Sequence, residues 1–381
     1  MPPPHTILID TSIFDQQAYN FSSPTVVKFL HVARARKLIL ILPDVIEREV
    51  KRHIKDKSRE ALKALRRARH DAPFLAKWTH WPANKLGKAA VAEIEATATA
   101  DWEKFLSNFK VEKLGYGRVD MNQVMDWYDQ QQAPFGEGEK RKEFPDAFAI
   151  AAAVAYAKSK KTKVAVVSKD FDYEKACALH PELLYLPDLP TATEDFMPEM
   201  KPQIDSIKRA NKSPLLARIC RDFPDLAFYP EEDPDGDVSD VEVEAVKLTE
   251  IKVLEIQGHE CTVAFSGRLR FSAFVSYDDP DTMIIDSSED IRIALHRKAG
   301  TVTENTDVSG TVTLEFDDGW TAIVSVSHLE FDSEDITVKT APEGYEEDAP
   351  DDPPDEPPEP PEPPKSSEPP RLTKPATPDA P

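Results

Sequence analysis

The sequence has few cysteines and no long apolar run, and these two absences exclude several classes of protein. Its three cysteines, Cys177, Cys220 and Cys261, are far apart, so they form neither a disulfide framework nor a paired zinc motif. No stretch approaches the roughly 18 consecutive apolar residues of a membrane helix. Residues 1–10 also lack the charged and apolar regions of a signal peptide. We therefore expect a cytoplasmic protein that does not cross a membrane.

Charge is distributed unevenly along the chain, whose net charge is −22. Residues 1–188 contain 30 Lys and Arg against 25 Asp and Glu, a net charge of +5. Residues 189–381 contain 17 against 44, a net charge of −27. This asymmetry favours a polyanionic partner for the first half of the chain only.

Residues 1–188 have the pattern of alternating strands and helices. Short apolar runs such as 38–42 (LILIL) and 163–168 (KVAVVS) are typical of strands buried in a parallel sheet. We expect strands at 5–10, 38–42, 163–168 and 183–186. We expect helices at 24–35, 44–70, near 87–109 and 118–131, and at 146–158 and 172–179. The order predicts an α/β domain with a mostly parallel sheet and right-handed crossovers.

The rest of the chain changes character twice. Residues 189–244 contain seven prolines, and we interpret them as a linker with a helix near 203–221. Residues 245–340 alternate apolar and polar side chains, as a smaller antiparallel all-β domain does. Residues 341–381 contain 15 prolines and 12 acidic residues, a composition that cannot bury a core and predicts a disordered tail.

Four carboxylates follow the predicted strands or open the helices of the first domain. Asp10 ends the first strand, Glu49 lies in the first two turns of the helix after the second, Asp146 opens a helix, and Asp170 follows the strand at 163–168. Ligands of an open parallel sheet bind beyond the carboxyl ends of its strands. Each acid alone has a structural explanation as a helix cap or a solvated residue. Together they predict a shared site.

Converging carboxylates repel one another unless a cation neutralises them. Their hard oxygen atoms select Mg²⁺ or Mn²⁺. Such a site activates water and shields the charge of an in-line attack on a phosphodiester. No histidine or cysteine lies near these motifs to favour zinc or a thiol nucleophile.

The ordered segments ILIDTS, LPDVIEREV, FPDAFAIAAAVA and VVSKDFD resemble a PIN domain, the fold of many RNases. The stretch APFGEGEKRKEFPDA is similar to one in a branch of larger uncharacterised bacterial PIN-like proteins. The resemblance covers about 5–188 and implies a PIN-like (Rossmann-like) parallel sheet flanked by helices. It implies that the metal-site carboxylates are Asp10, Glu49, Asp146 and Asp170, with Asp172 as an alternative to Asp170, and that Ser12 and Ser168 are supporting hydroxyls.

The predicted helix 44–70 is unusually basic, which favours a surface that follows phosphates, although a solvated helix explains it equally well. The candidate nucleic-acid-binding residues are Arg48, Lys51, Arg52, Lys55, Arg59 and, before Asp146, Lys142.

We therefore expect a metal-dependent nuclease, in particular an endoribonuclease that binds RNA and uses Mg²⁺ or Mn²⁺. One alternative is a catalytically silent PIN fold that serves as an RNA-binding or scaffold module. Another is a DNA-directed nuclease, because no residue identifiably reads a 2′-hydroxyl. The β domain is expected to bind a protein partner, by analogy of fold alone.

Overall fold

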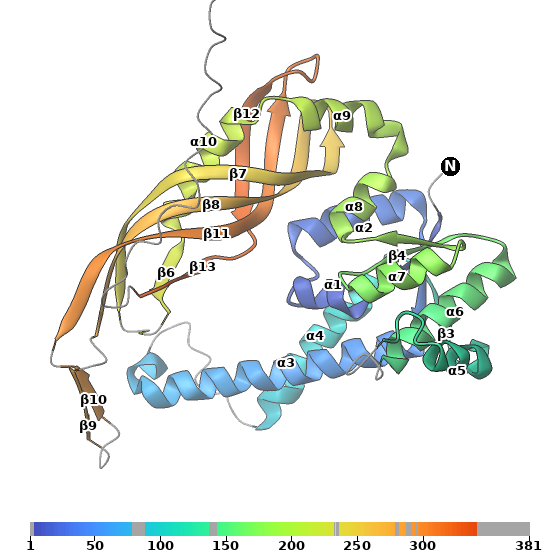
Figure 1. Ribbon diagram of the computed structural model, residues 1–381, viewed down its shortest axis with the longest axis horizontal. Coiled ribbons are helices and arrows are strands. Elements are labelled where there is room, and N and C mark those ends of the chain that lie inside the picture. Colours follow the sequence, from blue (N-terminus) through green and yellow to red (C-terminus); the bar gives the residue numbers. More distant parts are fainter. Residues whose placement is uncertain are drawn as a thin grey trace, which may run out of the picture.

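The computed structural model describes residues 4–77, 88–136, 143–231, 233, 236–278, 282–286, 291–294 and 296–340. These residues form an N-terminal α/β domain and a second unit dominated by a long curved β-sheet (Figure 1). Buried apolar side chains gather into two clusters, one in each unit. The predicted disordered tail, 341–381, lies outside the described residues, as does Lys142.

The first domain contains a five-stranded parallel sheet in the order β3-β2-β1-β4-β5. The central strands β1 and β4 read TILI and VAVV and are buried along their whole length, as strands covered on both faces must be. The strands are β1 (Thr6–Ile9), β2 (Ile39–Pro43), β3 (Lys110–Leu114), β4 (Val164–Val167) and β5 (Leu183–Leu186). The predicted parallel α/β fold is confirmed.

Helices cover both faces of this sheet. The helices are α1 (Thr11–Gln16), α2 (Pro24–Arg36), α3 (Asp44–Asp71), α4 (Lys88–Leu106), α5 (Met121–Asp129), α6 (Phe144–Lys160) and α7 (Phe171–Leu179), with 3₁₀ turns at Pro73–Lys77 and Tyr116–Arg118. Local chemistry explains their ends: Ser23 caps α2 through the backbone N–H of Val26, and Pro24 stands in its first turn. All six predicted helices are confirmed, with small shifts at their ends.

Two elements of this domain escaped prediction. The edge strand β3 reads KVEKL, and its burial is only partial apart from Leu114, so it lacks the apolar run that reveals β1 and β4. The six-residue helix α1 is too short to show a helical period. The strand at Val164–Val167 is therefore the fourth of the sheet in chain order.

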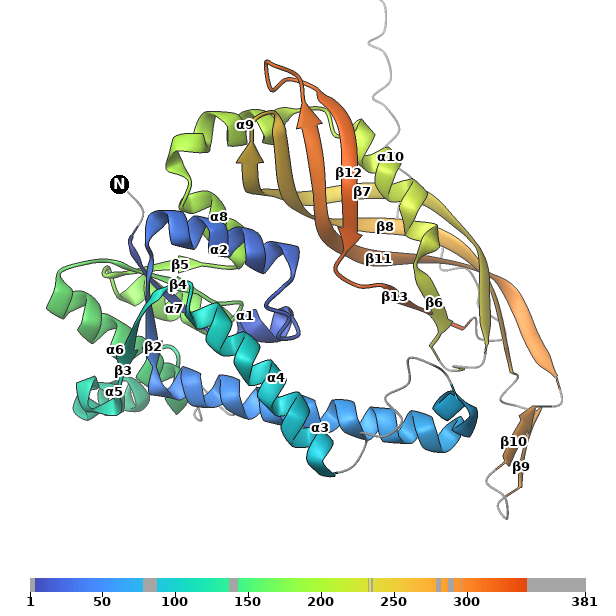
Figure 2. The same cartoon turned by 180° about the vertical axis from the view of Figure 1, so that it is seen from behind.

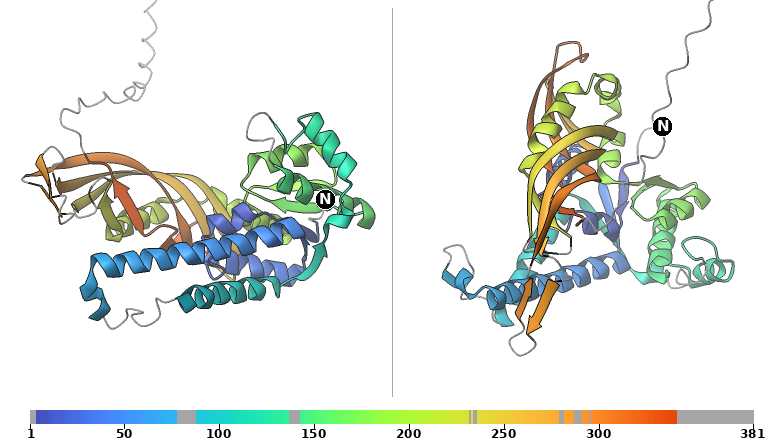
Figure 3. Two further views of the ribbon diagram at one scale, coloured as in Figure 1. Left: turned by 90° about the horizontal axis from the view of Figure 1, so that it is seen from below. Right: turned by 60° about the vertical axis from the view of Figure 1, so that its left-hand side comes forward.

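Helix α3 is 28 residues long and extends well beyond the domain, with α4 beside it (Figures 1 and 3). One face of α3 is buried, including Ile46, Val50, Ile54 and Leu62. These residues recur every four positions, so they form one stripe along the helix.

The segment after β5 contains more regular structure than the single predicted helix. Its elements are α8 (Leu189–Asp195), a 3₁₀ turn at Pro198–Met200, α9 (Lys201–Arg209), α10 (Ser213–Asp222), a 3₁₀ turn at Phe223–Asp225 and β6 (Ala227–Pro230). Ile207, Leu215, Ile219 and Phe223 are fully buried in the second core cluster. This segment therefore contributes to the core of the second unit.

The second unit is built on an antiparallel sheet in the order β12-β11-β8-β7. Its strands are β7 (Asp237–Gln257), β8 (Glu260–Asp278), β11 (Arg297–Phe316) and β12 (Ile323–Phe331). In β8 every second side chain is buried, which is the alternation expected of a sheet with one covered face. The predicted antiparallel sheet is confirmed.

Irregular pairing bends this sheet. The register of β7 against β8 shifts at four places along β7, and such bulges bend and twist a strand. The resulting curve is plain from both sides (Figures 1 and 2). Two further pairs complete the unit: β9 (Met283–Asp286) with β10 (Ile291–Ala294), and β13 (Asp335–Val338), which runs parallel to β6.

The two units are in direct contact. Glu255 of β7 forms ion pairs with Lys28 and His31 of α2, and Glu194 of α8 accepts a hydrogen bond from the backbone N–H of Val253 at 2.6 Å. The sheet therefore packs on the α2 and α8 side of the first domain. Among the described residues, we find no helix that has both the length and the apolar character needed to span a bilayer.

Candidate functional site

Asp10 lies at the carboxyl end of β1 and is 5% exposed. Its backbone N–H donates to the carbonyl of Val167 in β4 at 2.9 Å, which fixes it between the two central strands. Its Oδ2 accepts hydrogen bonds from Ser12 Oγ at 2.5 Å and Ser168 Oγ at 2.9 Å. The two predicted supporting hydroxyls therefore hold this carboxylate.

Ser168 connects Asp10 to Asp170. The hydroxyl of Ser168 is fully buried, and it accepts the backbone N–H of Asp170 at 3.0 Å. Asp170 caps α7 by accepting the backbone N–H of Asp172 at 2.8 Å. Lys169, which lies between Ser168 and Asp170, donates its backbone N–H to Ser12 Oγ at 3.1 Å. One hydrogen-bonded network thus links the ends of β1 and β4.

Asp146 in the first turn of α6 faces the same place. Burial, together with the negative charges of Asp10, Glu143 and Asp170, raises its pKa to about 8. The buried hydroxyl of Tyr173 donates to Asp146 Oδ1 at 3.2 Å. These interactions show that Asp10, Asp146 and Asp170 share one electrostatic environment.

Glu49 approaches from α3. Its Oε2 accepts a hydrogen bond from Thr11 Oγ1 at 3.0 Å, and Thr11 directly follows Asp10. Its Oε1 lies 3.0 Å from Arg52 Nη2 and 4.0 Å from His53 Nε2. The structure therefore brings all four predicted acids to one edge of the sheet, with Glu49 held by Thr11 and by Arg52 of its own helix.

Asp172 differs from Asp170 in its surroundings. Its side chain is only 8% exposed and lies 3.3 Å from Lys175 Nζ. The charge of Asp170 is among those that raise the pKa of Asp146. The choice of Asp170 over Asp172 as the metal-site acid stays a prediction.

Three site residues were missed by sequence reasoning. Glu143 is a further carboxylate whose negative charge raises the pKa of Asp146, Tyr173 donates a hydrogen bond to Asp146 from α7, and Thr11 holds Glu49. Glu143 stands three residues before Asp146, where a weak signal existed in the acidic KEFPDA motif. The contact of Tyr173 joins two helices and has no local signature.

The oxygen-rich donor set suits a hard divalent cation such as Mg²⁺ or Mn²⁺. The raised pKa of Asp146 also fits, because a nearby cation would favour its ionised form. In the described part of the chain, however, no three His, Cys, Asp or Glu side chains are close enough together to hold a metal ion. The carboxylates converge without forming a closed ligand set.

The predicted basic surface is exposed along α3, and several of its cations have partners. Arg48 lies over the Tyr116 ring, Lys51 pairs with Glu47 at 2.6 Å, Arg52 pairs with Glu49, and Arg59 pairs with Asp56 at 3.3 Å. These contacts leave most of the guanidinium and ammonium surface open to solvent.

Comparison with known proteins agrees with this geometry. Residues 7–173 match the family model described as the PIN domain. Together with the five-stranded parallel sheet, the match identifies the N-terminal part of the chain as a PIN-like domain. PIN domains are generally nucleases, which supports an enzyme of that broad class. No curated protein and no solved structure matches the chain. Its place in a branch of larger bacterial PIN-like proteins stays a prediction.

Proposed function

We propose that the chain is a metal-dependent endoribonuclease whose reaction occurs at the carboxyl edge of the parallel sheet. The observation that carries the proposal is the convergence of three acids: Ser168 bonds both the Asp10 carboxylate and the backbone of Asp170, and burial with the charges of these acids raises the pKa of Asp146 to about 8. Maintaining such mutual repulsion costs stability, and perturbed carboxylates of this kind gather at functional sites. A binding surface for a polyanion would gain nothing from clustered negative charge.

Asp10 and Asp146 are the residues that would bind Mg²⁺ or Mn²⁺ directly, and Glu49 and Asp170 would complete the shell or orient the attacking water. When bound, the ion supplies an activated water and neutralises charge on the phosphodiester. Ser12 and Ser168 fix the Asp10 carboxylate by donating hydrogen bonds to one of its oxygens. Tyr173 holds Asp146 in a similar way. No covalent intermediate is required.

The substrate would approach along α3, where Arg48, Lys51, Arg52, Lys55 and Arg59 are exposed. Cations on this helix begin beside Glu49 and continue away from the site, so a strand bound there would present a phosphate to the carboxylates. Affinity that rests on phosphate contacts falls steeply with salt.

The test is cleavage of labelled single-stranded RNA and DNA by wild type and four single variants, D10N, D146N, D170N and D172N, in Mn²⁺, Mg²⁺ or EDTA. We expect RNA cleavage only with metal, and losses of at least about 100-fold in D10N, D146N and D170N. D172N is the matched control and should retain most activity. Metal-independent cleavage, or full activity in D146N, would contradict the proposal. Preferential cleavage of DNA would reassign the substrate.

A second candidate is a catalytically silent PIN fold that binds RNA. One observation favours it: within the residues that the structure describes, the acids do not form a closed ligand set. This candidate predicts RNA binding without cleavage in any metal, and no effect of D146N on that binding.

A further inference from the structure

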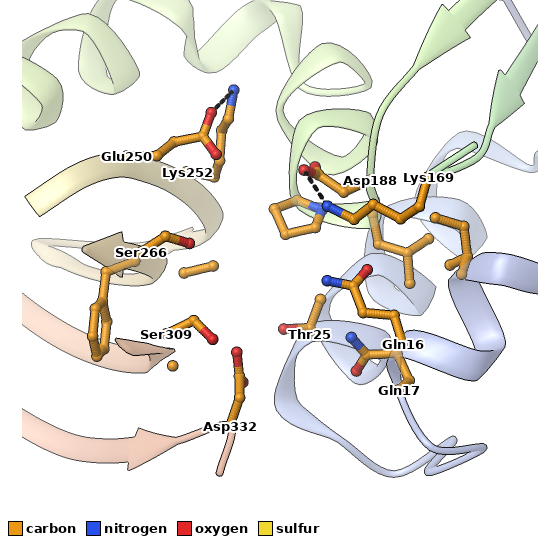
Figure 4. Close-up of a pocket in the computed structure, with 16 residues that line it drawn as sticks. Gln16, Gln17, Thr25, Lys169, Asp188, Glu250, Lys252, Ser266, Ser309 and Asp332 are labelled. Carbon is orange, nitrogen blue, oxygen red and sulfur yellow. Dashed lines mark hydrogen bonds and ion pairs between the residues drawn. The ribbon is translucent and has the colours of Figure 1, made fainter. Parts of the chain in front are cut away.

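A cavity of about 130 Å³ separates the two units beside the carboxylate site. Figure 4 shows its two walls facing each other across open space. One wall belongs to the PIN-like domain and includes Gln16, Lys169 and Asp188, and the other belongs to the sheet of β7, β8 and β11 and includes Ser266 and Ser309.

Lys169 connects this cavity to the proposed reaction site. Its backbone N–H donates to Ser12 Oγ, one of the hydroxyls that hold Asp10, while its side chain lines the cavity with Nζ 3.5 Å from Asp188 Oδ2. Helix α1 also joins the reaction site to the cavity. Asp10 caps the N-terminus of the helix, and Gln16, its last residue, lines the cavity. The segments that line the cavity are therefore continuous with those that hold Asp10 and Asp170.

The lining is polar and open to solvent. The side chains of Gln16, Ser266 and Ser309 make no hydrogen bond to any other described residue, so they are available to a ligand. Amide and hydroxyl groups both donate and accept hydrogen bonds, which is what the polar edge of a nucleobase requires. Protein recognition of single-stranded RNA commonly places an unstacked base among such groups.

We propose that this cavity is a base-binding subsite, in which the β unit supplies one wall and selects a nucleotide next to the cut phosphodiester. The inference rests on the proposed function for the class of substrate, a single-stranded nucleic acid. It gives the β unit a role in substrate recognition, in place of binding a separate protein.

Beyond the cavity, the face of β8 that includes Ser266 continues as a surface of the sheet. Side chains two residues apart share a face of a strand, so Arg268 and Arg270 follow Ser266 on the same face of β8. They are 67% and 53% exposed and pair with Asp307 and Glu244. Phe274, further along this face, is 39% exposed. Cations followed by an exposed ring are features that bind a single strand through its phosphates and bases.

The test fills the cavity from the β wall. Ser266→Trp places an indole between the two walls, and Ser325→Trp, at an exposed serine of β12 outside the cavity, is the matched control. Binding of a labelled single-stranded RNA is measured by fluorescence anisotropy in EDTA, so the result does not depend on catalysis. Gln16→Ala removes one hydrogen-bonding group without adding bulk, and melting curves establish that each variant is folded.

We expect S266W to weaken binding by at least 10-fold and Q16A by two- to fivefold, with S325W within twofold of wild type. In cleavage assays S266W should raise KM more than it lowers kcat. Equal binding by wild type, S266W and Q16A would overturn the subsite even if RNA is cut. Weaker binding by S266W without cleavage by any protein would retain the subsite and reject the nuclease. A wild type that binds no single strand overturns the subsite.

Discussion

At Asp146 the fold keeps a carboxyl group where its ionised form is disfavoured. Burial and the charges of Asp10, Glu143 and Asp170 raise its pKa from about 3.8 to about 8. The folded state therefore binds a proton that the unfolded state releases between these pH values. Stability must fall as pH rises through this interval in the absence of metal.

We predict that Asp146→Asn stabilises the metal-free protein at pH 8 by about 2–5 kcal/mol, because the neutral amide cannot ionise. The gain should shrink as pH falls toward 4, where Asp146 is protonated in both states. Urea unfolding in EDTA at several pH values measures it. Asp126→Asn, an exposed acid on α5, serves as the control. A destabilised D146N at pH 8 would contradict this account of the site.

Ser168 is the residue through which two of the acids are held. Its hydroxyl donates to Asp10 and accepts from the backbone N–H of Asp170, and Ser168→Ala removes both bonds in a fully buried position. We predict a loss of about 1–3 kcal/mol in stability and of about 10- to 100-fold in metal-dependent cleavage. Denaturant unfolding and initial rates are the measurements.

Ser159→Ala is the matched control for Ser168→Ala, because the Ser159 hydroxyl bonds the carbonyl of Tyr156 on the exposed side of α6. It should leave cleavage unchanged. If both serine variants cleave as wild type does, the hydroxyl of Ser168 has no part in holding the site.

Sequence order predicted that the four acids would lie at one edge of the sheet, because the carboxyl ends of neighbouring parallel strands meet there. Their role as metal ligands stays a prediction. Sequence order could not choose between Asp170 and Asp172, which lie two residues apart. Their difference depends on which side of α7 faces α6. Tyr173 was missed for a similar reason, since a buried tyrosine in a short helix is ordinarily core.

Helix α3 contains two glutamates of different character, Glu47 and Glu49. Glu47 is buried against β3, where Lys113 and Lys51 bond its carboxylate. Burial alone would raise the pKa of Glu47, but these two lysines outweigh it and lower the pKa below 4.5. Two residues further on, Glu49 turns to the carboxylate site. The helical turn thus separates a structural acid from a functional one.

We predict that Glu47→Gln destabilises the protein by about 1–2 kcal/mol at pH 7. A lowered pKa gives stability that is present above pH 4.5 and disappears as pH falls through the folded-state pKa, so the difference from wild type should vanish near pH 3. Urea unfolding across pH 3–7 measures this, with the exposed Glu60→Gln as control. A difference that persists at pH 3 would exclude the ion pairs as its cause.

Strands were predictable where they formed a continuous apolar run, and helices were predictable where one face was strongly apolar. β1, β4 and α3 satisfy this condition, whereas β3 is an edge strand with charges at three of its five positions and resembles an exposed loop. The bulges of β7 were also unpredictable. They depend on pairing with β8 across the whole sheet, and no residue type marks them in the sequence.

For the whole molecule, the important feature is that the β unit packs on the PIN-like domain close to the carboxylates. Polar contacts hold this interface, including Glu255 with Lys28 and His31. Such contacts join residues more than 200 positions apart and leave no periodic signal. The composition predicted a second β-rich unit but could not predict where it docks.

We predict that Glu255→Ala loosens this interface and costs about 1–3 kcal/mol, because Lys28 and His31 lose their shared carboxylate. In calorimetry the α/β and β units should then unfold in separate or broader transitions. Glu244→Ala, which removes an ion pair within the sheet, is the control and should leave the shape of the transition unchanged. A single, unshifted transition in E255A would show that the interface does not depend on this contact.

The central claim is that Asp10, Glu49, Asp146 and Asp170 form a divalent-cation site, and calorimetric titration with Mn²⁺ tests it most directly. At pH 7 we predict that wild type binds at least one ion and releases about one proton, because the ion displaces the proton that the raised pKa keeps on Asp146. The proton count comes from repeating the titration in two buffers of different ionisation enthalpy. D146N should bind more weakly and release no proton. Equal binding by wild type and D146N, or no binding by wild type, would contradict the account.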